Sequence, residues 1–221
     1  MNEARKPATR IQHNILAANE RRVLNWLCAR LPMWVTPDKL TIIGFVGALI
    51  IAAGHALSTV SIDWLWLSLA GYCVNWFGDS LDGSLARFRK IERPTYGHFI
   101  DHSTDALATS ILVGSLGLTP FIQFEVAMFG LIGYLLMTIH SFLTAQAMGE
   151  FRLSFLNGGP TELRLMLMAL TGAMFFVEPG PVIGNALSGF DIFAIAVGVI
   201  LVALYIGQTA SVARTLRRAG K

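Results

Sequence analysis

Six apolar stretches divide this chain, and they constrain its fold more than any other feature of the sequence. A transmembrane helix needs about 20 mostly apolar residues, and only the fifth stretch is clearly shorter than that. Charged residues make up 14% of the chain, against about 25% in soluble domains. We therefore predict an all-α integral membrane protein with six transmembrane helices. The predicted spans are Leu40 to Leu57, Trp64 to Arg87, His98 to Thr119, Phe121 to Ala147, Leu163 to Val177 and Phe190 to Ala213.

The basic residues agree with this number of spans. With six spans, all 17 lysines and arginines fall in the two terminal segments, in two loops or at the span ends beside them, on one side of the membrane. A different number of spans would scatter these charges over both sides. Because positive residues are retained in the cytoplasm, both termini are expected there. The formal net charge of only +3 gives no reason to expect a nucleic-acid partner.

A polar segment precedes the first span. From Ile15 to Leu31, leucines and valines recur at helical spacing between arginines, which predicts an amphipathic helix on the cytoplasmic membrane surface. Trp26 and Trp34 suit the headgroup zone; the alternative is an extension packed on the helix bundle. The predicted organisation is a cytoplasmic segment over residues 1–39, a six-span membrane domain over 40–213 and a basic tail over 214–221.

Four aspartates flank the loop between the second and third spans. Asp79 and Asp82 are three residues apart, and Asp101 and Asp105 are four apart, so each pair shares one face of a helix. A short loop makes the two helices antiparallel neighbours, and the four carboxylates are then expected to converge. Such charges repel one another unless cations lie among them. Mg²⁺ and Mn²⁺ prefer carboxylate oxygens and bridge to phosphates, so the pattern indicates a site for two divalent cations. The alternative, a solvated loop in which the aspartates pair with nearby arginines, does not explain the helical spacing on both sides.

Small and basic residues accompany the aspartates. Gly83 and Ala86 leave room for a ligand or for close helix approach, and Arg87 is placed to pair with a phosphate. Gly97 opens the third span, where a side chain would crowd a ligand. The acidic residues lie at one rim of the membrane; a transporter or another cation-binding membrane protein, the rival interpretation, should carry charges near mid-membrane.

The pattern Asp-x2-Asp-Gly-x2-Ala-Arg, nine further residues, then Gly-x3-Asp-x3-Asp resembles the signature of the CDP-alcohol phosphotransferases. These are membrane enzymes of phospholipid synthesis, and their usual spacer is eight residues. The resemblance implies two divalent ions, Mg²⁺ or Mn²⁺, held by the four aspartates, with Asp105 also the base that activates an acceptor hydroxyl. It further implies that Gly83, Ala86, Arg87 and Gly97 line the CDP site, and that the protein is a homodimer.

The implied reaction is attack of an alcohol on a CDP-linked donor with release of CMP, and one of the two substrates is a lipid. One branch of the family uses CDP-diacylglycerol and a small polar alcohol; the other uses CDP-choline or CDP-ethanolamine and a lipid hydroxyl. Asp101-His102 and Gly159-Pro160-Thr161-Glu162 resemble segments of the second branch. Six spans instead resemble the bacterial phosphatidyl-transferring enzymes, which would place the protein in a bacterial inner membrane. The sequence leaves the donor open.

Three further polar residues allow two interpretations each. His102 either orients or shares the acceptor proton, or is a surface hydrogen-bonding residue. Glu162 either pairs with Arg164 or Arg152, or binds the cation of an aminoalcohol, and pairing is favoured. Asp38, in a segment that resembles the family's entry to the first span, either caps that helix or contacts ligand, and capping is favoured.

Overall fold

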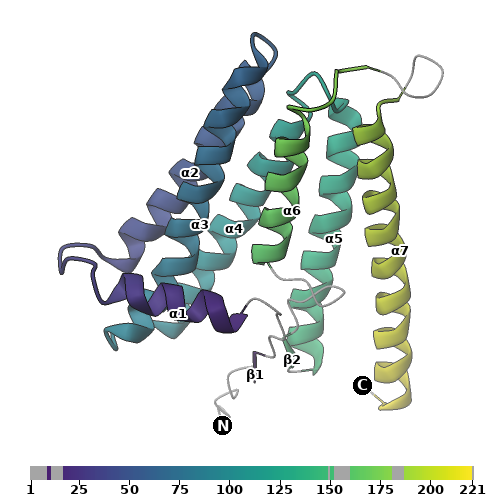
Figure 1. Ribbon diagram of the computed structural model, residues 1–221. Coiled ribbons are helices and arrows are strands. Elements are labelled where there is room, and N and C mark those ends of the chain that lie inside the picture. The colour runs from purple at the N-terminus through teal and green to yellow at the C-terminus, as the bar shows by residue number, and fades with distance from the viewer. Residues whose placement is uncertain (1–8, 11–16, 149, 152–159, 181–186, 221) are drawn as a thin grey trace.

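The computed structural model describes residues 9–10, 17–148, 150–151, 160–180 and 187–220, and within these ranges it is almost entirely helical (Figure 1). The helices are α1 (Ala17–Cys28), α2 (Pro37–Leu57), α3 (Leu65–Phe88), α4 (Pro94–Leu116), α5 (Phe124–Met148), α6 (Pro160–Ala173) and α7 (Gly189–Arg218), with a 3-10 turn η1 (Ile62–Trp64). Two strands of two residues each, β1 (Thr9–Arg10) and β2 (Glu150–Phe151), pair in parallel.

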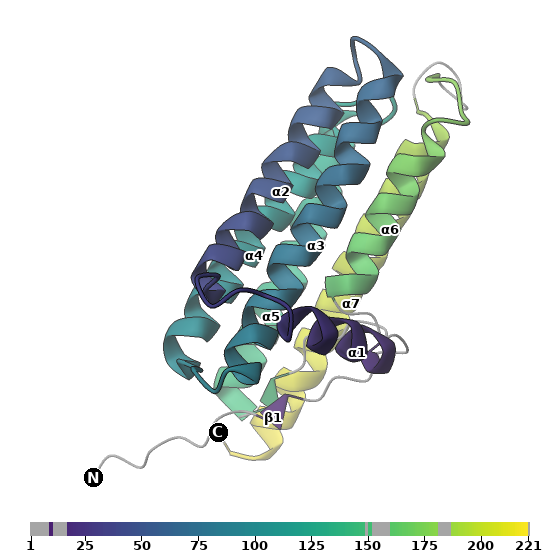
Figure 2. The ribbon, with the colours of Figure 1, turned by 60° about the vertical axis from the view of Figure 1, so that its left-hand side comes forward.

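Helices α2 to α7 run along a common direction, whereas α1 lies across one end of the bundle (Figures 1 and 2). Three helices, α2, α5 and α7, are long and apolar enough to cross a membrane. Many of their large apolar side chains are exposed, among them Ile42, Ile139 and Ile206, as expected for surfaces that face lipid. A helix, α1 (Ala17–Cys28), lies within the segment Ile15 to Leu31, of which Ile15 and Leu16 are outside the described residues; that it is an amphipathic helix on a membrane surface stays a prediction.

The start of α2 corrects the expectation for Asp38. The helix begins at Pro37, three residues earlier than predicted, and its N-cap is Thr36, whose hydroxyl accepts a hydrogen bond from the backbone N–H of Lys39 at 3.4 Å. Proline is favoured in the first turn because its ring already has the helical φ angle, and this moves the cap to the residue before it. Asp38 therefore does not cap the helix; its carboxylate binds Arg93 at 2.8 Å.

Glycines bring α2 and α3 together at backbone contact. A Cβ added at Gly78 of α3 would collide with the backbone of Gly44 and Leu40 of α2, and one added at Gly44 would reach the backbone N of Asp79. Small residues allow this approach in membrane helix pairs. This contact fixes the position of α3 along α2, and it lies directly beside the first pair of aspartates.

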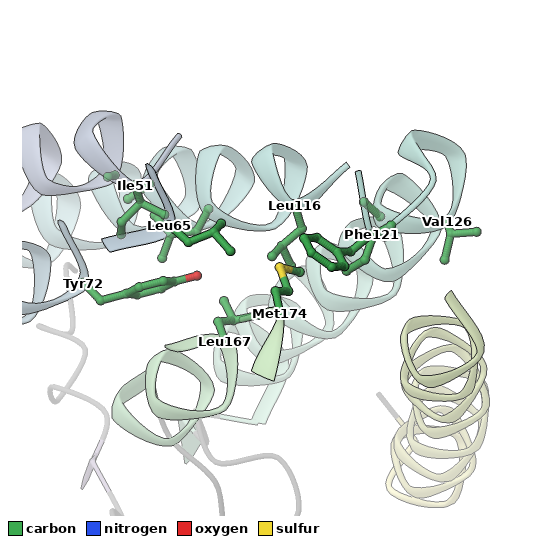
Figure 3. Close-up of a cluster of buried hydrophobic side chains, with 13 residues drawn as sticks. Ile51, Leu65, Tyr72, Leu116, Phe121, Val126, Leu167 and Met174 are labelled. Carbon is green, nitrogen blue, oxygen red and sulfur yellow. The ribbon is translucent and has the colours of Figure 1, made fainter. Parts of the chain in front are cut away.

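The apolar core lies where α2, α3, α4 and α6 meet the start of α5, as the close-up of Tyr72, Leu116 and Met174 shows (Figure 3). A polar bridge crosses this core. His55 of α2 is fully buried, with Nδ1 2.8 Å from the hydroxyl of Ser115 in α4 and Nε2 3.1 Å from the hydroxyl of Thr171 in α6. Buried polar groups are costly unless hydrogen-bonded, so this bridge fixes three helices relative to one another.

Candidate active site

The structure brings the four aspartates together at one end of the bundle. Asp79 and Asp82 lie in the last turns of α3, and Asp101 and Asp105 lie in the first half of α4. Asp82 is within electrostatic reach of both Asp79 and Asp101. Asp105 lies close to Asp101, and it lines one cavity with Arg164, which is itself bound to Asp79. Carboxylates gathered in this way repel one another, so their charges need compensation by protons or cations.

Asp82 is the least solvent-exposed of the four, with 8% of its surface exposed. One carboxylate oxygen accepts a hydrogen bond from the hydroxyl of Thr41 in α2 at 2.6 Å, and the other accepts one from the backbone N–H of Gly83. These two donors hold the carboxylate in one orientation. The contact with Thr41 exists because Gly44 and Gly78 bring α2 against α3.

His102 lies beside the second pair of aspartates. One ligand atom each from Asp101, His102 and Asp105 lies within 4.8 Å of the others, a spacing at which three groups can hold one metal ion. The His102 Nδ1 is 3.9 Å from the Asp101 carboxylate, and its ring packs edge-on against His98 and Phe142. The imidazole is therefore held next to the carboxylates rather than turned to solvent.

Arg164 of α6 reaches into the same cluster, a contact that sequence reasoning missed. Its Nη2 donates to Asp79 Oδ2 at 2.7 Å, and its Nε donates to Asn75 Oδ1 at 2.7 Å. Asn75 in turn donates to the backbone carbonyl of Gly44 at 2.8 Å. A sequence signal for Asn75 did exist, because it lies four residues before Asp79 and shares its helical face. No spacing rule connects Arg164 to α3.

A small cavity of about 30 Å³ adjoins this contact, and Asn75, Asp105, Thr109, Tyr134 and Arg164 contribute its polar lining. The Nη1 of Arg164 is buried and has no hydrogen-bond partner among the described residues. A water molecule needs roughly 10–15 Å³ of such space. The cavity can therefore hold a water or one oxygen-bearing group next to Asp105.

The residues predicted to line a CDP site, Gly83, Ala86, Arg87 and Gly97, are all partly or fully exposed to solvent. A Cβ at Gly83 would approach the Arg87 guanidinium at 3.3 Å, whereas one at Gly97 would meet nothing within 4 Å. Arg87 is exposed and donates to the hydroxyl of Ser84 at 3.3 Å. Ala86, one residue before Arg87, is partly buried. The guanidinium is thus accessible to an anion that approaches the aspartates from outside the bundle.

Helix α1 contacts α3 and α6 through Glu20. Its carboxylate accepts hydrogen bonds from the indole N–H of Trp76 in α3 at 3.0 Å and from the hydroxyl of Thr161 in α6 at 3.1 Å. These two hydrogen bonds join α1 to α3 and to the first turn of α6, where Glu162 also lies. Gly159 and Arg152, which the sequence associates with Glu162, lie outside the described residues.

This chain resembles known proteins over most of its length. A family model described as CDP-alcohol phosphatidyltransferase matches residues 34–213. A zebrafish (Danio rerio) protein named cholinephosphotransferase 1 is 27% identical over 190 residues, which cover 79% of this chain and 48% of the zebrafish protein. The chain therefore spans about half the length of this curated relative.

Proposed function

This chain belongs to the CDP-alcohol phosphatidyltransferase family, and from that premise we propose that it transfers a substituted phosphate group from a CDP-linked donor to an alcohol, with release of CMP. The observation that carries the proposal is the convergence of Asp79, Asp82, Asp101 and Asp105 from two antiparallel helices. A transporter would have no need for a complete family motif at one rim of the bundle.

Two divalent cations, Mg²⁺ or Mn²⁺, fit the donor set. All four aspartates offer carboxylate oxygen, the ligand that these ions prefer, and ligand atoms of Asp101, His102 and Asp105 lie within 4.8 Å of one another, close enough to share one ion. We assign the metal ligands as Asp79, Asp82, Asp101 and Asp105. When bound, the ions would neutralise the donor pyrophosphate and the charge that develops on the leaving CMP.

Side chains of this protein accept the proton of the acceptor hydroxyl and position the substrates. The acceptor oxygen forms a bond to the phosphorus next to the non-nucleotide group, the bond from that phosphorus to the CMP oxygen breaks, and the hydroxyl proton passes to the Asp105 carboxylate. His102, held beside Asp101 and Asp105, orients the acceptor or shares this proton. Arg87, with room left by Gly83 and Gly97, binds the CDP phosphates together with the backbone near Ala86.

For the donor we favour CDP-choline or CDP-ethanolamine with a lipid hydroxyl as acceptor. The name of the zebrafish relative supports this choice, as do the adjacent residues Asp101-His102 and the Pro160-Thr161-Glu162 start of α6. Glu162, in the first turn of α6, is then the candidate to bind the aminoalcohol cation. CDP-diacylglycerol with a small polar alcohol is the alternative, and a donor panel scored for CMP separates the two.

We further propose that α2 to α7 all span the membrane, with α1 on the cytoplasmic surface and the aspartates at the cytoplasmic end. The helices α3 and α4 have 24 and 23 residues, enough to cross a bilayer, although their polar residues at the aspartate end lower their mean hydropathy. The 14-residue α6 is short for a span, and it would need local thinning of the bilayer or cover from neighbouring helices. The proposed domain limits, residues 1–39, 40–213 and 214–221, and a homodimer complete this arrangement.

The decisive experiment uses protein purified in lipid nanodiscs with Mg²⁺ and each CDP-linked donor. Wild-type protein should release CMP, and Asp105→Asn should reduce that rate by at least about 10²-fold, because removal of a general base typically costs 10²–10⁴. Asp63→Asn is the matched control, since Asp63 is exposed in η1, outside the aspartate cluster. Full turnover in Asp105→Asn, or in excess chelator, would refute the assignment.

A further inference from the structure

Arg164 is bound to Asp79, one of the four proposed metal ligands. Only 11% of the Arg164 side chain and 23% of the Asp79 side chain are exposed, and the two are joined at 2.7 Å. Asp79 is the first aspartate of the motif, so one of its two carboxylate oxygens is already bound to an internal cation. The pair therefore places a fixed positive charge within the group of carboxylates that the metal ions would share.

We propose that Arg164 is an internal counter-ion that competes with divalent cations for Asp79 and so lowers the metal affinity of the cluster; this rests on the proposed function. The physical basis is repulsion. A guanidinium is always charged, and it repels a second positive group a few ångströms away even at an effective dielectric constant of about 20. The same charge stabilises the protein without metal, because it offsets the repulsion among four converging carboxylates.

The hydrogen bonds of Arg164 indicate how its ion pair with Asp79 can break when a metal ion binds Asp79. Its Nε is bound to Asn75, which is itself anchored to the backbone of Gly44, and this contact does not involve any aspartate. Nη1 is buried, has no partner among the described residues and belongs to a side chain that lines the cavity beside Asp105. The guanidinium can therefore keep its bond to Asn75 while its Nη groups exchange the carboxylate for an oxygen of the arriving substrate, since arginine binds phosphate and carboxylate with the same fork of donors.

The test measures metal binding without any substrate. Mn²⁺ is titrated into purified protein in nanodiscs and free Mn²⁺ is followed by electron paramagnetic resonance. Arg164→Gln and Arg164→Met both remove the charge, and each should bind Mn²⁺ at least about tenfold more tightly than wild type, because the repulsion between guanidinium and metal ion is gone. Arg164→Lys keeps the charge and should stay within about threefold of wild type. Two neutral variants are used so that one remains informative if the other fails to fold.

Arg93→Gln is the matched control, because Arg93 is also paired with a carboxylate, that of Asp38, but this pair is about half exposed. Its Mn²⁺ affinity should equal that of wild type. An unchanged or weaker affinity in the neutral Arg164 variants overturns the counter-ion role while leaving the metal site intact. Failure of the wild-type protein to bind Mn²⁺ refutes the proposed metal site itself, and the counter-ion role with it.

Discussion

Replacement of Gly78 by alanine tests whether the contact between α2 and α3 sets the geometry of the aspartates. A Cβ at this position would collide most closely with the backbone N of Gly44, and it would lie 2.5 Å from Gly44 Cα and 2.5 Å from the carbonyl oxygen of Leu40, whereas ordinary contact begins at 3.4 Å. The colliding atoms belong to backbone, so they cannot rotate away. Relief of the two 2.5 Å contacts alone requires the helices to separate by about 0.9 Å near Asp79, and the closer contact with Gly44 N requires more.

Two consequences of that separation can be measured. Overpacking of this kind costs about 1–3 kcal/mol, so the thermal midpoint of the purified protein should fall by several degrees. A displacement of about 1 Å in a catalytic group can cost on the order of 10²-fold in rate. We therefore expect CMP release by Gly78→Ala to fall by one to two orders of magnitude at saturating Mg²⁺.

Gly207→Ala is the control, because a Cβ at this position in α7 meets nothing within 4 Å. It should retain the wild-type rate and midpoint. If Gly78→Ala behaves like this control in both measurements, then α2 and α3 do not approach at backbone contact, and that contact is not what positions Asp82 beside Thr41.

Other variants probe the remaining contacts. Thr41→Val removes a donor to the buried Asp82 carboxylate and should destabilise the protein by about 1–3 kcal/mol, seen as a lower thermal midpoint in chelator and a smaller loss with Mg²⁺. His55→Leu breaks the buried bridge between α2, α4 and α6 and should lower the midpoint without changing Mn²⁺ affinity; a changed affinity would contradict a purely structural role. Glu20→Ala unties α1 from α3 and α6, so trypsin should cleave within α1 faster than in wild type, and an unchanged rate would refute the tie. Burial raises the pKa of the Cys28 thiol, so at pH 8 less of it is thiolate, and iodoacetamide labelling followed by mass spectrometry should be slower in the native protein than in denatured protein.

The sequence was sufficient where the information is local. The spacing of Asp79 and Asp82, and of Asp101 and Asp105, predicts shared helical faces, and the short loop makes the two helices neighbours; the structure brings these side chains together. The helical nature of the protein followed equally from the apolar stretches. These features depend only on residues close together in the chain.

Contacts between distant helices could not be predicted. Arg164 reaches Asp79 because α6 packs against α3 at a particular rotation and depth, which no spacing rule specifies. The incorrect expectation for Asp38 has a local cause instead. Thr36 and Asp38 can both cap a helix. Pro37 between them occupies the first helical turn, so the N-cap is Thr36 and not Asp38.

The pairing of Arg164 with Asp79 has a consequence for how the protein is made. The two residues are 85 positions apart in the chain, and a ribosome adds roughly 5–20 residues per second. A nascent chain would therefore carry its aspartates for about 4 to 17 s before the arginine is synthesised. With the aspartates at the proposed cytoplasmic end, free Mg²⁺ in the cytosol would be a partner for these carboxylates during that interval, and depletion of Mg²⁺ during translation should lower the yield of inserted protein more than the same depletion afterwards.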